Sequence, residues 1–127
     1  MEQARRDTAE RRRRTDEAGR DYERFLERHA VPIFHTFAAA LTAEGRRFTV
    51  FTPAGSVRLA SDASGEDFIE LSLDASQDPP RVLGRTSRGR GRLMVTTERP
   101  LDPAVADLTD EDVLEFLLAE IGPFVGR

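Results

Sequence analysis

The chain has 127 residues, enough for one domain with a buried core, and its 39% hydrophobic and 33% charged residues are typical of a folded protein. It contains no cysteine, which excludes a disulfide framework, a thiolate nucleophile and a zinc finger. Its basic side chains, apart from two histidines, are all arginine. Schiff-base chemistry on lysine and a phosphate-loop lysine are therefore excluded as well.

The net charge of −4 is unevenly distributed, because residues 98–127 hold two arginines against eight acidic residues. A general nucleic-acid binder needs a positive surface, so any such surface here has to be local. No apolar run approaches the roughly 20 residues that span a bilayer, and the first residues are charged where a signal peptide is apolar. We therefore expect a cytoplasmic protein with no membrane partner.

The N-terminal segment mixes both charge signs, with acids placed four residues before arginines in the order that stabilises a helix. Because its first half lacks apolar residues, we predict a charged arm, helical or disordered, over residues 1–17, followed by a single α+β domain over residues 18–127. The run Arg11, Arg12, Arg13 and Arg14 is either a solvated helix face or an arm that docks on an acidic surface. Residues 107–115, "DLTDEDVLE", would supply such a surface on a second copy.

A helix is predicted from Ala18 onward by apolar residues at spacings of three and four. Pro32 lacks a backbone donor, so we expect a kink or a fresh helix near it, and Gly45 supplies the stop. The predicted apolar stripe comprises Ala18, Tyr22, Phe25, Leu26, His29, Ile33, Phe34, Phe37 and Leu41.

Five short strands follow. Residues 47–52 and 56–61 flank a Pro-Ala-Gly turn, residues 67–74 alternate cleanly, and residues 81–87 and 92–97 flank a turn predicted near residues 88–90. Alternation assigns one apolar face to Phe48, Val50, Val57, Leu59, Ile69, Leu71, Leu73, Val82, Leu93 and Val95.

A last helix is predicted from residue 109, where Thr109 and Asp112 suit a variant of the capping box and Gly122-Pro123 would end the helix. Its predicted buried stripe is Val113, Leu114, Leu117, Leu118 and Ile121. The apolar face of the sheet can cover both helical stripes. The predicted fold is therefore a two-layer α+β sandwich, with an antiparallel sheet of about five strands and both the long N-terminal helix and the C-terminal helix on one face.

The other face of the sheet would interleave arginine with aromatic residues. It is either a platform that binds single-stranded nucleic acid, or a structural surface on which Glu70 pairs with Arg58 or Arg85 and the apolar residues are covered by a helix or a second subunit. The candidate binding residues, which include the neighbouring turn, are Phe51, Arg58, Phe68, Glu70, Arg85, Arg88, Arg90, Arg92 and Met94.

An enzyme is the weakest interpretation. His29 and His35 do not share a helix face, no nucleophile-elbow motif occurs, and no metal or other cofactor is expected. The acidic residues at 62–70 and 110–112 suit loops and helix caps better than catalysis. The sequence therefore favours a non-catalytic interaction or adaptor module whose partner is itself, as a homodimer, or another protein. Single-stranded nucleic-acid binding and an enzyme with an unrecognised acidic site are the alternatives.

Overall fold

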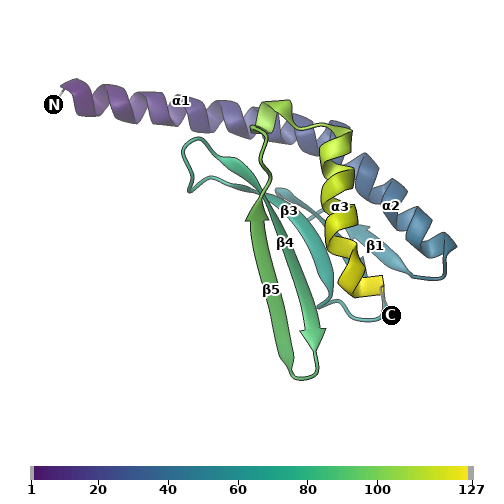
Figure 1. The fold of residues 1–127 in the computed structure, drawn as a ribbon. Coiled ribbons are helices and arrows are strands. Elements are labelled where there is room, and N and C mark those ends of the chain that lie inside the picture. The colour runs from purple at the N-terminus through teal and green to yellow at the C-terminus, as the bar shows by residue number, and fades with distance from the viewer. Residues whose placement is uncertain (1, 126–127) are drawn as a thin grey trace.

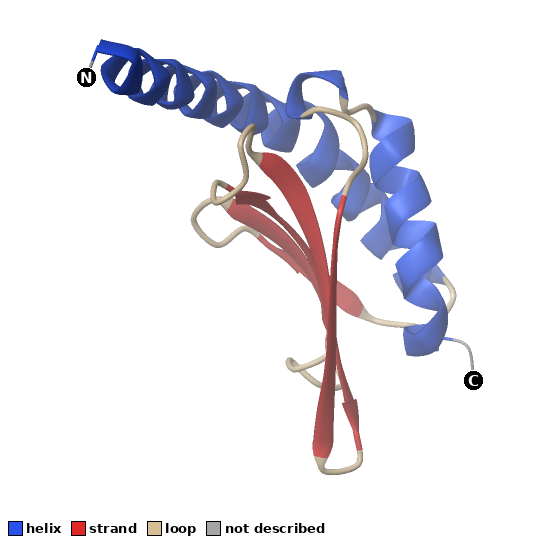
Figure 2. Ribbon diagram, turned by 60° about the vertical axis from the view of Figure 1, so that its left-hand side comes forward, coloured by secondary structure: helices blue, strands red, loops and turns tan. Residues whose placement is uncertain are grey.

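A computed structural model describes residues 2–125 of the chain. All three α-helices lie on one side of a single antiparallel sheet, whose strands follow one another in the order β1-β2-β3-β4-β5 (Figures 1 and 2). This confirms the predicted two-layer α+β sandwich. The elements are α1 (Glu2–Phe25), η1 (Leu26–Ala30), α2 (Val31–Ala43), β1 (Phe48–Phe51), β2 (Ser56–Ser61), β3 (Phe68–Asp74), β4 (Arg81–Arg90), β5 (Leu93–Pro100), η2 (Val105–Asp107) and α3 (Asp110–Val125).

The core lies between the sheet and the helices. Alternation along each strand directs one set of side chains toward α2 and α3, and Val57, Leu59, Ile69 and Leu71 of that set are fully buried. Where β4 passes under α3, Gly84 leaves room for the ring of Phe116, which occupies the space a side chain would fill. Phe34 from α2 and Phe116 and Leu117 from α3 belong to the same buried cluster.

The long N-terminal helix is interrupted by a π-helical turn, η1, before the proline. The backbone N–H of Val31 donates to the carbonyl of Leu26, one residue further back than in an α-helix, and Pro32 lies in the first turn of α2. The interruption predicted near Pro32 is therefore present as a wider turn. Because this turn takes up one additional residue, the buried positions after Phe25 are Ala30 in η1 and Phe34 and Ala38 in α2, whereas His29, Ile33 and Phe37 of the predicted stripe are half-buried.

The structure confirms the predicted end of α2 and the predicted start of α3, but not the predicted end of α3. Gly45 has φ 85°, and the backbone N–H of Arg46 donates to the carbonyl of Leu41. These two features end α2. Thr109 and Asp112 form the expected capping box, with the Thr109 N–H donating to the Asp112 carboxylate at 2.9 Å. The predicted stop at Gly122-Pro123 was wrong, because α3 continues through Pro123 to Val125.

The predicted stripe of α3 was wrong at two positions. Leu114 and Leu118 are exposed, and Phe116, which was not predicted, is buried. The helix is rotated so that the large ring of Phe116 meets Gly84 on β4, and this rotation turns Leu114 and Leu118 outward.

The β4–β5 hairpin departs from the prediction in its turn and in its burial. Its turn is Gly91-Arg92, where Gly91 adopts φ 62°, so residues 88–90 belong to β4. The hairpin extends beyond the end of α3 (Figure 2). Leu93 and Val95 were wrongly predicted to be core residues: this end of the hairpin lies beyond the helix layer formed by residues 2–125, and they are 71% and 37% exposed.

Candidate functional site

The sheet face opposite the helices carries a row of charged side chains from three adjacent strands. Arg58, Glu70 and Arg85 are direct cross-strand neighbours. Arg58 Nε donates to Glu70 Oε2 at 2.9 Å, and Arg85 Nη2 donates to Glu70 Oε1 at 2.9 Å. The carboxylate is buried beneath the two guanidinium groups, with only 8% of the Glu70 side chain exposed. Both arginines are thus engaged inside the molecule, which is the structural pairing that the sequence suggested.

The aromatic ring beside this row is also engaged. The guanidinium carbon of Arg58 lies 3.9 Å from the centroid of the Phe68 ring, and that of Arg85 lies 5.5 Å away. Stacked arginines stabilise such a ring through its quadrupole. A nucleic-acid base that stacked on the same side of Phe68 would have to displace Arg58.

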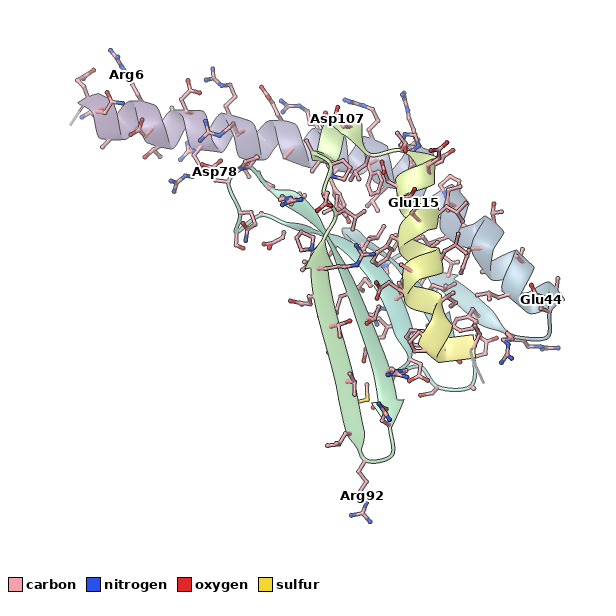
Figure 3. All side chains as sticks on the ribbon, viewed as in Figure 1. Arg6, Glu44, Asp78, Arg92, Asp107 and Glu115 are labelled. Carbon is pink, nitrogen blue, oxygen red and sulfur yellow. The ribbon has the colours of Figure 1, made fainter. Side chains whose placement is uncertain are left out.

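The nine residues suggested as a binding surface do not form one surface. Arg88 and Arg90 share the helix-facing side of β4 with Gly84, and Arg92 lies in the turn at the tip of the hairpin (Figure 3). The exposed Phe51 and Met94 lie on the two outer strands, β1 and β5, which are at opposite edges of the sheet. The face opposite the helices therefore carries six of the nine residues, and contacts join four of them: Arg58, Phe68, Glu70 and Arg85. Phe51 and Met94 lie apart at its two edges, and Arg88, Arg90 and Arg92 lie off this face.

The arginine run on α1 is partly held by the same chain. Arg14 forms two hydrogen bonds of 2.9 Å with the carboxylate of Asp78 in the β3–β4 loop, and Arg11 lies 3.5 Å from it. These contacts fix the exposed first half of α1 above the loop (Figure 3). The hydrogen bond from Arg14 lowers the pKa of Asp78 below its usual range. Arg13 pairs with Glu10 one turn earlier.

His29 and several of the acidic side chains singled out in the sequence have structural partners. His29 Nδ1 lies 2.6 Å from Asp110 Oδ1, Thr49 donates to Asp62 at 2.6 Å, and the Gly89 N–H donates to Asp67 at 2.8 Å. In residues 2–125 no group of three or more potential ligands is placed to hold a metal ion. No helix in the same range is long and apolar enough to cross a membrane.

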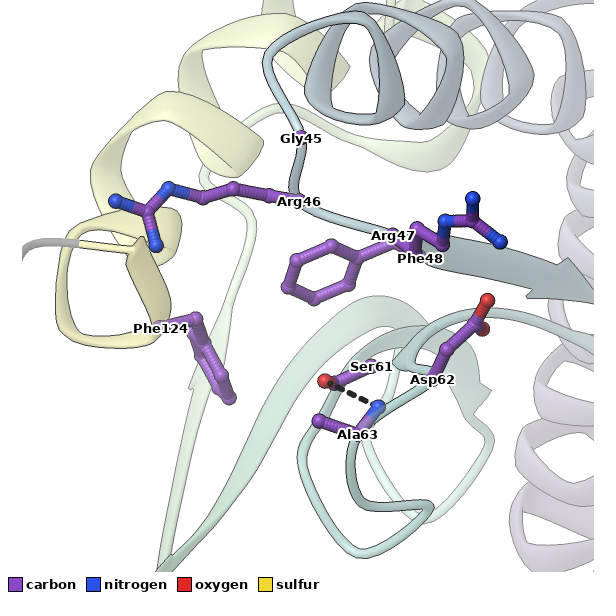
Figure 4. Close-up of a pocket in the computed structure, with 8 residues that line it drawn as sticks. All are labelled: Gly45, Arg46, Arg47, Phe48, Ser61, Asp62, Ala63 and Phe124. Atoms are coloured by element: carbon purple, nitrogen blue, oxygen red, sulfur yellow. Dashed lines mark hydrogen bonds between the residues drawn. The ribbon is translucent and has the colours of Figure 1, made fainter.

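An open hollow of about 440 Å³ lies between the loop after α2, the β2–β3 loop and the end of α3. The rings of Phe48 and Phe124 project into it, and Ser61 and Ala63 are joined by a hydrogen bond at its floor (Figure 4). Its one carboxylate, Asp62, accepts the hydrogen bond from Thr49. The hollow therefore lacks a paired acid and base or an activated nucleophile.

A second hollow, of about 480 Å³, lies between the end of β5 and the outer flank of α3. Its apolar wall is formed by Leu101, Pro103, Phe116 and Ala119, and acidic residues of α3 stand at its rim. Arg99 on β5 crosses its side, donating to Glu120 at 3.1 Å with its guanidinium 5.2 Å from the Phe116 ring centroid.

Strand β5 forms an open edge of the sheet next to this hollow. Each of its eight residues is exposed, and Leu93, Met94 and Val95 bring adjacent apolar side chains to the surface. Sequence reasoning missed this edge as a functional feature. The available signal was the apolar run after "RGRGR", which was assigned to the core in part and to the opposite sheet face in part.

Comparison with protein-family models, with curated proteins and with solved structures found no match. The geometry alone therefore carries the functional argument.

Proposed function

We propose that the protein is a non-catalytic protein-interaction module that associates with itself. The observation that carries this proposal is the open edge of β5, where eight consecutive strand residues are exposed. An edge strand presents unpaired N–H and C=O groups that another chain can extend, and folded monomers usually protect such an edge. Here the protecting residues, Glu98, Arg99 and Pro100, all stand at the end of the strand, and the five residues from Leu93 to Thr97 carry no charge and no proline.

The side chains near this edge also favour a partner. Leu93 is 71% exposed and is followed by two further exposed apolar residues, Met94 and Val95. Leu93 and Val95 lie on the helix-facing side of the hairpin and Met94 lies on the other side, so both faces of this edge expose apolar side chains, which is typical of a protein-binding site. The two hollows and the histidine contacts, by comparison, offer no arrangement of groups that supports a catalytic reaction.

Single-stranded nucleic-acid binding is less well supported. The two arginines nearest the exposed aromatic positions, Arg58 and Arg85, are both bonded to Glu70, and Arg58 lies on the Phe68 ring. We expect no mobility shift of a labelled single-stranded oligonucleotide at low salt. A salt-sensitive shift that is lost in Arg85→Gln would favour this alternative instead.

The test of self-association is the molar mass in solution, measured by light scattering on a sizing column over a wide dilution series. The chain mass is 14.2 kDa, and we expect twice this value at high protein concentration, falling toward the chain mass on dilution. A value of 14.2 kDa at every concentration would refute the proposal.

A further inference from the structure

We propose that two copies join β5 to β5 as antiparallel neighbours about a two-fold axis at Thr96, so that the hairpin tip of each copy lies against the α3 flank of the other. This inference rests on the proposed self-association and specifies its surface.

The backbone of β5 sets the possible registers. Leu101 donates to the carbonyl of Val82 on β4, and hydrogen-bonded pairs alternate along an antiparallel ladder. The N–H and C=O groups of Met94, Thr96 and Glu98 therefore point away from β4, toward the open edge. With Thr96 on the two-fold axis, these three residues meet their counterparts and form about six hydrogen bonds between the copies. Pro100, which has no N–H to donate, falls at the end of this ladder.

This register also covers the exposed apolar residues. A two-fold axis perpendicular to the sheet keeps the helices of both copies on the same side. Leu93 and Val95 point to that side, and they belong to the start of β5, at the tip of the hairpin that extends beyond the end of α3 (Figure 2). In the proposed pairing they stand opposite Arg99 and Thr97 of the other copy, where the other copy's α3 begins to overlie the sheet.

The hollow beside α3 is the receiving surface. It lies next to Arg99, and its wall includes Leu101, Phe116 and Ala119. A leucine opposite Arg99 on an added strand projects from the helix-facing side of the sheet into this hollow. Leu93 of the other copy would then exchange its 71% exposure for contact with an apolar wall.

The charges of the two surfaces are complementary. The hairpin tip carries Arg88, Arg90 and Arg92, and residues 86–97 contain no acidic residue. Asp112 and Glu115 line the hollow on α3. Each basic tip thus approaches an acidic flank, which favours this pairing over one that brings the two tips together. Arg92, at the end of the ladder, is also diagonal to Glu98 of the other copy.

The absence of cysteine from the chain allows a direct test by cross-linking. In the variant Thr96→Cys the two introduced thiols face each other across the axis, with Cα atoms about 5.5 Å apart, inside the span of about 4.4–6.8 Å that a disulfide allows. The matched control is Arg92→Cys, also exposed on the hairpin, whose two copies lie roughly 27 Å apart in this register. We expect a disulfide-linked dimer under mild oxidation for Thr96→Cys and none for Arg92→Cys. Equal cross-linking of both variants, or preferential cross-linking of Arg92→Cys, would overturn the register.

A second measurement tests the hollow. Leu93→Asp places a negative charge against the apolar wall and near the carboxylates of Asp112 and Glu115. Arg99 of the other copy, which stands opposite, is already bonded to Glu120, so we expect the variant to weaken the dimer at least about tenfold. Leu118→Asp makes the same change at an exposed leucine on the other flank of α3 and is expected to leave the dimer unchanged. Because both leucines are exposed, both variants should retain the circular dichroism spectrum of the parent protein.

The two proposals fail in different ways. A parent protein that is monomeric at every concentration removes both of them. A parent dimer that persists in Leu93→Asp and does not cross-link through Thr96→Cys retains the proposed function but refutes the β5 interface.

Discussion

Replacing Gly84 with alanine is expected to destabilise the protein, although alanine usually suits a strand better than glycine. A Cβ atom at position 84 would lie 2.3 Å from Cε1 and 2.6 Å from Cζ of Phe116. Ordinary carbon contacts are about 3.5–4.0 Å, so the ring would have to move by roughly 1 Å or more. Phe116 is buried in the core, and the open space beside it is the hollow at the outer flank of α3, so a ring displaced into that hollow would lose its packing on β4.

The magnitude follows from two opposing effects. Overpacking of a buried site costs about 1–3 kcal/mol, whereas replacing glycine with alanine restricts the unfolded chain and contributes about 0.4–1 kcal/mol. We expect a net loss of about 1–2 kcal/mol in the free energy of unfolding. Gly19→Ala is the matched control, because no atom lies within 4 Å of its added Cβ and the residue stands inside α1. It should stabilise the protein by up to about 1 kcal/mol.

Urea unfolding, followed by circular dichroism, measures both variants. With a denaturant slope of about 1–3 kcal/mol per molar for small proteins, the two midpoints should move in opposite directions and differ by about 1 M urea. A second change, Phe116→Leu, should reduce the loss in Gly84→Ala, so that the double variant loses less than the sum of the two single changes. A midpoint for Gly84→Ala that moves as far upward as that of Gly19→Ala would refute the packing of Phe116 on β4.

Three further changes test contacts elsewhere. Glu70→Gln should lower the free energy of unfolding by about 1–3 kcal/mol, because it weakens the pairing of a buried side chain with two arginines, whereas Glu98→Gln on the exposed edge should change it little; chemical denaturation compares the two. Asp78→Asn should speed amide exchange in the first half of α1. The pKa of Asp78 is lowered in the folded protein, so its pairing with Arg14 stabilises the fold at a pH above the unfolded pKa. This stabilisation is lost as the pH falls through the folded pKa, and the difference between Asp78→Asn and the parent protein should therefore disappear in acid. Thr109→Ala should cost about 1 kcal/mol through loss of the α3 cap, and Thr109→Ser, which keeps the hydroxyl, should restore most of the loss in thermal unfolding.

Local patterns in the sequence were sufficient to predict the five strands, the helices and the capping box. Alternation and helical spacing depend on neighbouring residues, and these signals are strong in β3 and around Thr109. The cross-strand bonds of Glu70 to Arg58 and Arg85 could also be anticipated, because the alternation pattern placed all three on one face.

The errors concern features that depend on how separate elements meet. Both Gly89 and Gly91 lack a side chain and could occupy the hairpin turn. The pairing of β4 with β5, which a local pattern does not contain, places Gly91 there. Leu93 has the spacing of a core residue, but its burial depends on where the helix layer ends. The rotation of α3 is set by the fit of Phe116 to Gly84, a contact between residues 32 positions apart. The open β5 edge depends on strand order, which no local pattern contains.

The π-helical turn Leu26–Ala30 makes the N-terminal helix tolerant of a change in chain length at one place. Deletion of a residue from an α-helix normally rotates everything beyond it by about 100°. Here the interval between the buried residues Phe25 and Ala30 is five, and removal of one residue would leave an interval of four, which a regular α-helix also places on one face. Pro32 is then the remaining obstacle to an uninterrupted helix. A shortened chain carrying alanine in place of this proline could keep both halves of the helix packed on the same sheet. Insertions and deletions within this fold are accordingly expected to gather at this turn.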